Sequence, residues 1–188
     1  MLRPLLAGAE VTLDGDFFRL DRVRILPAPR PPVPVVIGGR SDAALRRVGR
    51  YGDGWLGLWV SPARYASATA LIAKYAADAG RDVLAWEHGM HVWCGFGTPA
   101  GAARDRLSAT MEGFYQLPFG KFEMYSPCGT AAQVAESLRP YAEAGCRSFN
   151  LIPVADGEQA AIEGAAEVRA LLTRGDLSPR TPLGKDYT

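Results

Sequence analysis

The segment PVVIGGRSDAALRRVGRYGDGWLGLW, residues 34–59, decides which class of fold the chain can adopt. It opens with a continuous apolar run, which is typical of a strand buried on both faces, and that run stops at Gly38-Gly39. Ser41 is then well placed to cap the first turn of a helix. A second strand follows the helix, so the segment has the strand–helix–strand order of a parallel α/β sheet.

The same alternation continues towards the C-terminus. Strands are predicted at 33–37, 54–59, 85–94 and 148–154. Helices are predicted from Ser41, at 62–80, at 102–114, from Thr130 to Gly145 and at 159–172. These four units predict a parallel sheet with helices outside it, either an open doubly wound sheet or part of an eight-stranded barrel. No strand is followed by a Gly-x-Gly-x-x-Gly fingerprint, and the pattern alone does not choose between the two architectures.

The clearest helix start in the chain is Thr130-Ala131-Ala132-Gln133. It has the pattern of a capping box, in which two backbone N–H groups at the helix start are satisfied reciprocally. Pro140 falls inside the same helix and is expected to bend it or to mark a local irregularity.

Residues 1–32 differ in character from the four units. They begin with what resembles the end of a helix, followed by two short extended runs at 10–13 and 17–20. Asp14-Gly15-Asp16 joins these runs, and an Asp-Gly pair in this place indicates a hairpin. Closely spaced prolines then predict a stiff extended connector.

We therefore expect a single domain over residues 1–172, with the four units at 33–172 and a loose tail at 173–188. Hydrophobic residues make up 48% of the chain and charged residues 22%, which suits a globular core. The net charge of +1 argues against a nucleic-acid partner. No apolar run is long enough for a membrane span, and the three widely spaced cysteines suggest neither a metal site nor a disulfide framework. These features favour a cytoplasmic protein.

Two motifs in family order resemble the luciferase-like monooxygenase superfamily. The first is the opening segment, with its Ile-Gly-Gly strand end and the Gly52-Asp53-Gly54-Trp55 run that begins the next strand. The second starts at Gly129-Thr130, includes the capping box, and ends at Phe149-Asn150-Leu151. The resemblance covers nearly the whole chain, and the presence of both motifs makes it specific.

The resemblance implies that the four units are units five to eight of a (β/α)8 barrel, which makes the chain a half-barrel of TIM type with a short N-terminal hairpin. Four strands do not close a barrel of eight, and an open half exposes two sheet edges and an apolar inner face. We therefore expect a homo-oligomer or a partner chain that supplies the other half. A truncated product that folds poorly is the alternative.

The resemblance also implies a cofactor, which is either FMN or the 5-deazaflavin coenzyme, and a small organic substrate. Gly38, Gly39 and Ser41 form the best candidate site, because a glycine turn before a helix N-terminus suits an anion and the family holds the cofactor phosphate there. By similarity, the backbone at Leu58 and Trp59 lies beside the same phosphate or ribityl chain. For Asp53 and Trp55, which belong to the first motif, a structural role is favoured.

His88 and His91 are the two histidines, and both fall on the third predicted strand. A histidine can move protons near neutral pH, and the two-residue period of a strand puts His91 and His88 on opposite faces. His91 is the candidate catalytic residue, with a satisfied core histidine as the alternative. Other candidates are a substrate mouth at Glu123 and Tyr125 and attraction of an anionic tail by Lys121 and Arg147, whereas Cys94 and Cys128 are expected to be small hydrophobes.

The function expected from the resemblance is a flavin- or deazaflavin-dependent oxidoreductase or monooxygenase that needs self-assembly or a partner for activity. A second hypothesis is a non-catalytic flavin-binding or complementing half-barrel subunit. A third, an unrelated open α/β binding domain, requires both family motifs to be coincidental.

Overall fold

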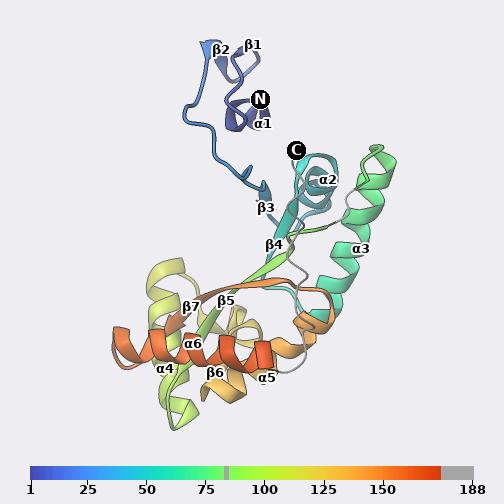
Figure 1. The fold of residues 1–188 in the computed structure, drawn as a ribbon. Coiled ribbons are helices and arrows are strands. Elements are labelled where there is room, and N and C mark those ends of the chain that lie inside the picture. Colours follow the sequence, from blue (N-terminus) through green and yellow to red (C-terminus); the bar gives the residue numbers. More distant parts are fainter. Residues whose placement is uncertain (83–84, 175–188) are drawn as a thin grey trace. The chain divides into compact units, whose positions relative to one another are not determined.

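A parallel sheet forms around strand β5 (Gly89–Phe96) in the computed structural model, which describes residues 1–82 and 85–174. β3 (Val36–Gly38) pairs with β4 (Gly54–Leu58), β4 pairs with β5, and β5 pairs with β7 (Ser148–Val154), all in parallel. These four strands therefore lie side by side in the same order as in the sequence (Figure 1). The two-residue strand β6 (Cys128–Gly129) pairs with the end of β5. The predicted parallel α/β sheet is therefore confirmed.

The helices form where capping residues and apolar periodicity predict them. They are α2 (Asp42–Tyr51), α3 (Pro62–Asp78), α4 (Ala100–Tyr115), α5 (Ala131–Glu143) and α6 (Glu158–Arg174). Ser41 accepts a hydrogen bond from the Ala44 N–H at the start of α2. At the start of α5, Thr130 and Gln133 make both bonds of the capping box. Pro140 lies inside α5, which continues past it to Glu143.

Two strands of the parallel sheet begin later than their sequence patterns predict. The first was expected from residue 33, but β3 begins at Val36, after the closely spaced prolines. The third strand was expected from residue 85, but β5 begins at Gly89. The reason is that the Trp55 backbone N–H donates its hydrogen bond to His88 Nδ1, at 3.1 Å, and not to a backbone carbonyl of a neighbouring strand. His88 is buried and its ring stacks on Trp86 with centroids 4.9 Å apart. It is therefore a satisfied core histidine. Of the predicted loose tail, residues 175–188 lie outside the described residues.

Side chains alternate along β5 between two hydrophobic clusters on opposite faces of the sheet. The even-numbered residues join a large core covered by α2, α3, α5 and α6. The odd-numbered Trp93 joins a smaller cluster with Leu107 and Met111 of α4. A Cβ added at Gly95, on this second face, would lie 2.9 Å from the Ala103 carbonyl oxygen of α4. The helix α4 is therefore pressed against the face opposite the other helices.

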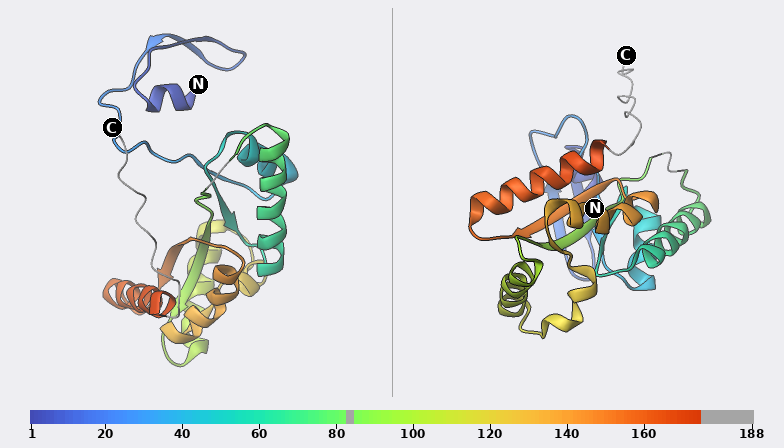
Figure 2. Two further views of the ribbon diagram at one scale, coloured as in Figure 1. Left: turned by 45° about the vertical axis from the view of Figure 1, so that its right-hand side comes forward. Right: turned by 90° about the horizontal axis from the view of Figure 1, so that it is seen from below.

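α4 thus lies on the face of the sheet opposite α2, α3, α5 and α6. In Figure 2, α4 and α6 lie on opposite sides of β7. α4 packs there because Trp93, Ile152 and Val154 make the carboxyl end of this second face apolar, and an apolar surface is stabilised when a helix covers it. We call the second face, towards which His91 and Asn150 point, the open face; α4 covers its carboxyl end.

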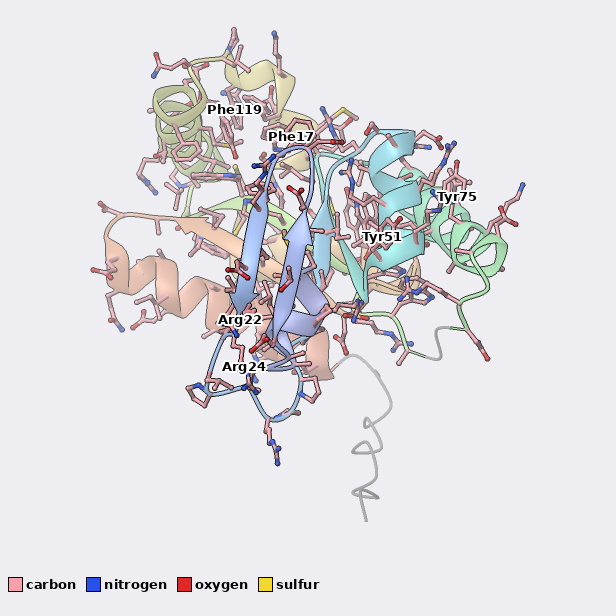
Figure 3. The ribbon with its side chains drawn as sticks, turned by 90° about the horizontal axis from the view of Figure 1, so that it is seen from above. Phe17, Arg22, Arg24, Tyr51, Tyr75 and Phe119 are labelled. Carbon is pink, nitrogen blue, oxygen red and sulfur yellow. The ribbon has the colours of Figure 1, made fainter. Side chains whose placement is uncertain are left out.

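Arg81 fixes the end of α2 from beyond α3. Its guanidinium donates to the carbonyl oxygens of Val48, Gly49 and Gly52, the last at 2.8 Å. A cation that satisfies the last carbonyls of a helix also stabilises its negative dipole end. On the exposed side, the Tyr75 hydroxyl donates to Asp42 at 2.6 Å and joins α3 to the start of α2; Figure 3 labels Tyr75.

The chain divides into two compact units, Met1–Val35 and Val36–Thr188. The first contains α1 (Leu2–Leu6) and an antiparallel hairpin of β1 (Val11–Asp14) and β2 (Arg19–Val23), as the Asp-Gly signal predicts. Arg24, labelled in Figure 3, donates to the Gly8 carbonyl and ties the hairpin to α1. The assignment of residues 1–172 to one domain stays a prediction. No helix in the described ranges is long and apolar enough to cross a membrane.

The buried His88 predicts a pH-dependent stability. Burial lowers its pKa from about 6.5 to about 4, so the unfolded chain binds more protons than the folded chain between these values. Stability is then full above pH 6.5 and falls as the pH drops towards 4. Urea denaturation from pH 7.5 to 4 should show this slope in the wild-type chain and a smaller one in His88→Asn, which keeps an acceptor near Nδ1 but does not titrate.

His88→Leu is the matched variant that removes the acceptor as well. It leaves the Trp55 N–H buried and unpaired, which should cost about 1–3 kcal/mol of unfolding free energy at pH 7. Equal stability of the Leu and Asn variants at pH 7 would show that the bond does not contribute. His91 also has a lowered pKa, but it is present in every variant, so the differences report on His88.

Candidate functional site: a glycine corner beside the open sheet face

The predicted glycine turn forms at the carboxyl end of β3. Gly39 has φ +111°, a left-handed conformation that a side chain disfavours, and a Cβ there would lie 2.8 Å from the Ala44 Cβ. At Gly38 the nearest atom to an added Cβ is 4.0 Å away, so its backbone is open to close approach. The Trp55 indole N–H donates to the Gly39 carbonyl at 2.8 Å and holds the turn in place. Trp55 therefore has the structural role that was favoured for it.

Arg40 joins this turn to the end of the next strand. Its Nη1 donates to the Trp59 carbonyl at 3.2 Å, and its guanidinium carbon lies 5.6 Å from the Trp59 ring centroid. Trp59 itself has φ +49°, which turns the chain sharply after β4. The structure thus brings together the two predicted halves of the site, the turn before Ser41 and the backbone at Leu58 and Trp59. We call residues 38–41 with 58–59 the glycine corner.

The predicted His91 lies one strand away from this corner. Register pairs Leu58 with His91 and His91 with Asn150, so the three residues form one row across the open face. The row before it, towards the amino ends of the strands, contains Leu56, Gly89 and Ser148. The Asn150 side-chain nitrogen is 3.0 Å from His91 Nδ1. Burial lowers the pKa of His91, which favours the neutral ring.

An aromatic cluster closes the carboxyl end of the open face. Its rings come from the end of β4, from β5, from α4 and from the following loop, and neighbouring centroids lie 4.5–6.0 Å apart: Trp59, Trp93, Phe114, Tyr115 and Phe122. The Trp93 indole N–H donates to the Tyr115 hydroxyl at 3.0 Å. The Trp59 indole N–H is buried and has no hydrogen-bond partner within the described part of the chain. A buried donor of this kind beside the glycine corner is available to an acceptor group of a ligand.

The chemistry of the glycine corner suits an anionic group. Backbone N–H groups at the start of α2 carry the positive end of the helix dipole, and Arg40 adds a formal charge beside them. Asp42 opposes this field in the first turn. Its carboxylate is engaged by Tyr75 at 2.6 Å and by Arg46 at 3.1 Å, which directs its charge away from the turn. The residues present therefore fit a phosphate.

Glu123 and Tyr125 border a cavity that also contacts the face of β5 opposite to His91. They belong to the loop of short 3-10 turns η1 (Phe119–Lys121) and η2 (Glu123–Tyr125). They line a cavity of about 200 Å3 together with Met90 and Val92, which are the even-numbered residues of β5, and with Leu138 of α5. The residues of the glycine corner do not line this cavity, although Phe122 of the same loop contacts Trp59 with ring centroids 4.5 Å apart.

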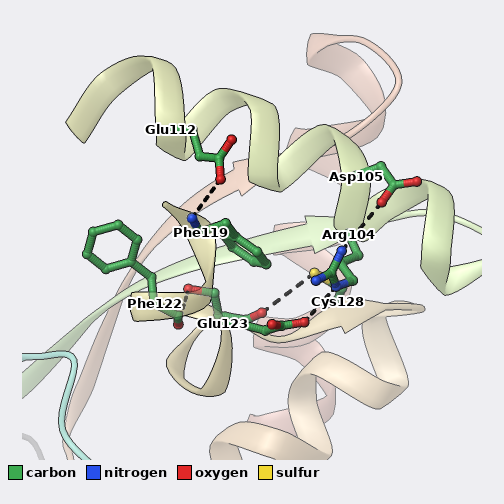
Figure 4. A network of polar contacts seen from close by, with 8 residues as sticks. Arg104, Asp105, Glu112, Phe119, Phe122, Glu123 and Cys128 are labelled. Carbon is green, nitrogen blue, oxygen red and sulfur yellow. Dashed lines mark hydrogen bonds and ion pairs between the residues drawn. The ribbon is translucent and has the colours of Figure 1, made fainter. Parts of the chain in front are cut away.

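Figure 4 shows what holds this loop. Arg104 of α4 donates to Glu123 at 2.6 Å, and the Phe119 N–H donates to Glu112 at 2.7 Å. The Arg104 guanidinium lowers the pKa of Glu123. Glu123 is therefore paired with a cation and ties the loop to α4, which is a structural role.

The remaining candidates are not gathered at the corner. Lys121 lies on η1 and is exposed, and Arg147 precedes β7, where its backbone N–H donates to the His88 carbonyl. Cys94 is fully buried and burial raises its pKa to about 12, so it is a core residue as expected. Cys128 is half-buried, and burial raises its pKa as well.

Sequence reasoning missed two residues of the site. Arg40 directly follows the glycines of the opening motif, and its charge in that place is a usable signal. Asn150 stands in the predicted fourth strand, where a polar side chain between apolar neighbours indicates a face that is not simply core. The pairing of Asn150 with His91 of β5 depends on the strand register, and the sequence pattern does not reveal that register.

The fold and the glycine corner define an α/β protein with a glycine turn and an arginine at the carboxyl edge of a parallel sheet, beside an open face that contains a histidine. The sequence profile of the luciferase-like monooxygenase family matches residues 1–167. The chain belongs to this family.

Relatives and solved structures are consistent with this assignment. An F420-dependent hydroxymycolic acid dehydrogenase of Mycobacterium tuberculosis is 32% identical over 85 residues, which are 44% of this chain and 22% of that protein. The pyrimidine monooxygenase RutA of Escherichia coli is 35% identical over 86 residues, 44% of this chain and 24% of that protein. These alignments cover less than a quarter of either relative.

The fold is shared with longer enzymes. A solved F420-dependent secondary alcohol dehydrogenase, in complex with an F420–acetone adduct, superposes with a TM-score of 0.78 at 20% identity. The match covers 91% of this chain and 58% of that one. The monooxygenase RslO1 from Streptomyces bottropensis superposes with a TM-score of 0.66 at 19% identity, covering 92% and 56%. The chain thus spans little more than half the length of these solved structures.

The left-handed turn at Gly39 predicts a specific cost of adding a methyl group. Gly39→Ala combines an unfavourable φ with a contact to Ala44, and the unfolding free energy should fall by about 1–3 kcal/mol. Gly113→Ala is the matched control, because it lies in the exposed part of α4 with nothing within 4 Å of the new Cβ. That variant should gain about 0.5–1 kcal/mol. The denaturant concentration at half-unfolding is measured for both variants, and an unchanged midpoint for Gly39→Ala would contradict the predicted loss of stability.

Proposed function

We propose that the chain is part of a flavin- or deazaflavin-dependent oxidoreductase and that the glycine corner binds the phosphate of FMN or of coenzyme F420. The observation that carries this proposal is Arg40, which joins the Gly39 turn to Trp59 and puts a guanidinium at the start of α2. Support comes from the family assignment and from relatives whose names specify F420 or a monooxygenase activity. A flavin would supply oxygen activation and a deazaflavin would supply hydride transfer.

In this proposal the chain's own residues bind and orient the cofactor. Gly38 and Gly39 allow the backbone to approach the phosphate, Ser41 keeps the first turn of α2 capped, and Arg40 balances the charge. Leu58 and Trp59 line the path from the corner to the row that contains His91. Two strand spacings, about 10 Å, separate β3 from β5, the strand that contains His91. His91 is the residue proposed to act at the reacting end.

We also propose that the four strand–helix units correspond to units five to eight of a barrel and that activity requires further strands over the open face. The supporting observations are the exposure of Val36, Ser148 and Asn150 on that face and the chain order of the four strands. A parallel barrel of this kind closes with eight strands. Self-association or a partner chain would supply the cover, and a subunit that only binds the cofactor is the second candidate function.

The charge at the corner predicts the effect of one substitution on cofactor affinity. FMN and F420 are titrated separately into the 188-residue chain and followed by fluorescence and calorimetry. One of them should bind, and Arg40→Ala should weaken its binding about tenfold, close to 1.4 kcal/mol. Arg47→Ala removes the same charge from an exposed site further along α2 and should change the affinity less than twofold.

Three outcomes of this titration are informative. Binding that depends on Arg40 but not on Arg47 supports the proposal. Binding of neither cofactor contradicts it, as does an equal effect of the two substitutions. Light scattering on the same samples reports the assembly state, and turnover that appears only in a discrete oligomer would favour the enzyme over the binding subunit.

A further inference from the structure

His91 and Asn150 form a pair in which the side-chain nitrogen of Asn150, and not its oxygen, faces His91 Nδ1. The Asn150 amide nitrogen is only a donor, and it lies 3.0 Å from His91 Nδ1. A hydrogen bond between them therefore requires a lone pair on Nδ1. The ring must then be neutral, with its proton on Nε2.

The surroundings of the pair favour the same state. Across the row, the neighbour on β4 is Leu58, and along β5 the neighbours on this face are Gly89 and Trp93. The Trp93 indole N–H is already engaged by Tyr115, and β7 adds Ser148 and Ile152 beside Asn150. These neighbours place no carboxylate beside the ring that would stabilise an imidazolium. Burial, the cause of the lowered His91 pKa, acts in the same direction.

His88 shows that the chain uses the same arrangement in its core. There, Nδ1 accepts a hydrogen bond from the Trp55 backbone N–H at 3.1 Å, and the buried ring stacks on Trp86. His91 differs because it is only half-buried and stands on the open face. The same tautomer at His91 therefore leaves an Nε2–H donor on the face that leads from the glycine corner.

We propose that Asn150 is a positioning residue that holds His91 as a neutral Nε2–H donor, and that His91 donates this hydrogen bond to a carbonyl or developing oxyanion of the bound cofactor or substrate. The proposal rests on the proposed function for its ligand. It assigns no proton transfer to His91, since the ring begins and ends neutral. An aspartate in place of Asn150 would accept a hydrogen bond from an Nδ1–H, and its negative charge would favour the charged ring, which is why an amide suits this role.

The tautomer is measured by long-range 1H–15N NMR on the uniformly 15N-labelled 188-residue chain. The chain has 2 histidines, so the His88→Asn variant assigns the His91 signals. At pH 7 His91 should show the neutral Nε2–H pattern. Asn150→Ala should give a mixture of tautomers, and Asn150→Asp should raise the pKa of His91 above its ordinary value. Ser148→Ala, on the same face of β7, should leave the pattern unchanged.

A second arm tests the donor role with FMN and F420 as the probes. The Nε2 and Hε1 signals of His91 should shift when the cofactor that binds in the Arg40 experiment is added. Binding that depends on Arg40 but leaves these signals unmoved, also after addition of a simple ketone, overturns the donor role and leaves the proposed function standing. Absence of binding overturns the proposed function together with the donor role.

The NMR spectrum of His91 without cofactor tests the positioning role of Asn150 independently of the cofactor titrations. A wild-type ring with its proton on Nδ1, or a charged ring at pH 7, overturns the positioning role. So does an Asn150→Ala spectrum identical to that of the wild-type chain, provided that far-UV circular dichroism shows the variant to be folded.

Discussion

The two-residue period of strand β5 is the constraint on which the rest of the structure depends. Because neighbouring side chains point to opposite faces, one strand has to satisfy two environments at once. Its even-numbered residues pack into the core under α2, α3, α5 and α6, and its odd-numbered residues face the open side with Trp93 under α4. A register shift of one residue would exchange His91 with a core position. The site and the core are therefore specified by the same pairing.

The glycine corner depends on this pairing through polar contacts that join successive strand ends. The Trp55 indole donates a hydrogen bond to the Gly39 carbonyl, and the Arg40 guanidinium donates one to the Trp59 carbonyl. His88 then ties Trp55 to the start of β5. The residues that order the corner are thus mostly core or backbone groups, and the groups that would meet a ligand are the backbone of the glycines, one guanidinium and one indole N–H.

Much of this arrangement follows from local sequence, and some of it does not. Most of the strands, the helices, the capping box and the glycine turn were predictable because each depends on residues close together in the chain. The late start of β5 was not, because it depends on a side-chain acceptor that reaches Trp55 from His88. The place of α4 was not predictable either, since helical periodicity shows an apolar stripe but not the sheet face that the stripe meets. The ion pair of Glu123 with Arg104, which anchors a loop, was not predictable either, because it joins residues far apart in the chain.

The position of α4 sets the dimensions of whatever the open face accommodates. Beyond the row of His91 and Asn150, the next row of the sheet is covered by α4 and its aromatic cluster. The uncovered floor is therefore short along the strands and ends at a wall of rings that include Tyr115. Altering the rings that α4 contributes to that wall changes the length of the space without touching the sheet, whereas altering β5 disturbs two faces together. An engineer who wishes to change ligand size should begin with α4, and the same freedom is open to natural variation.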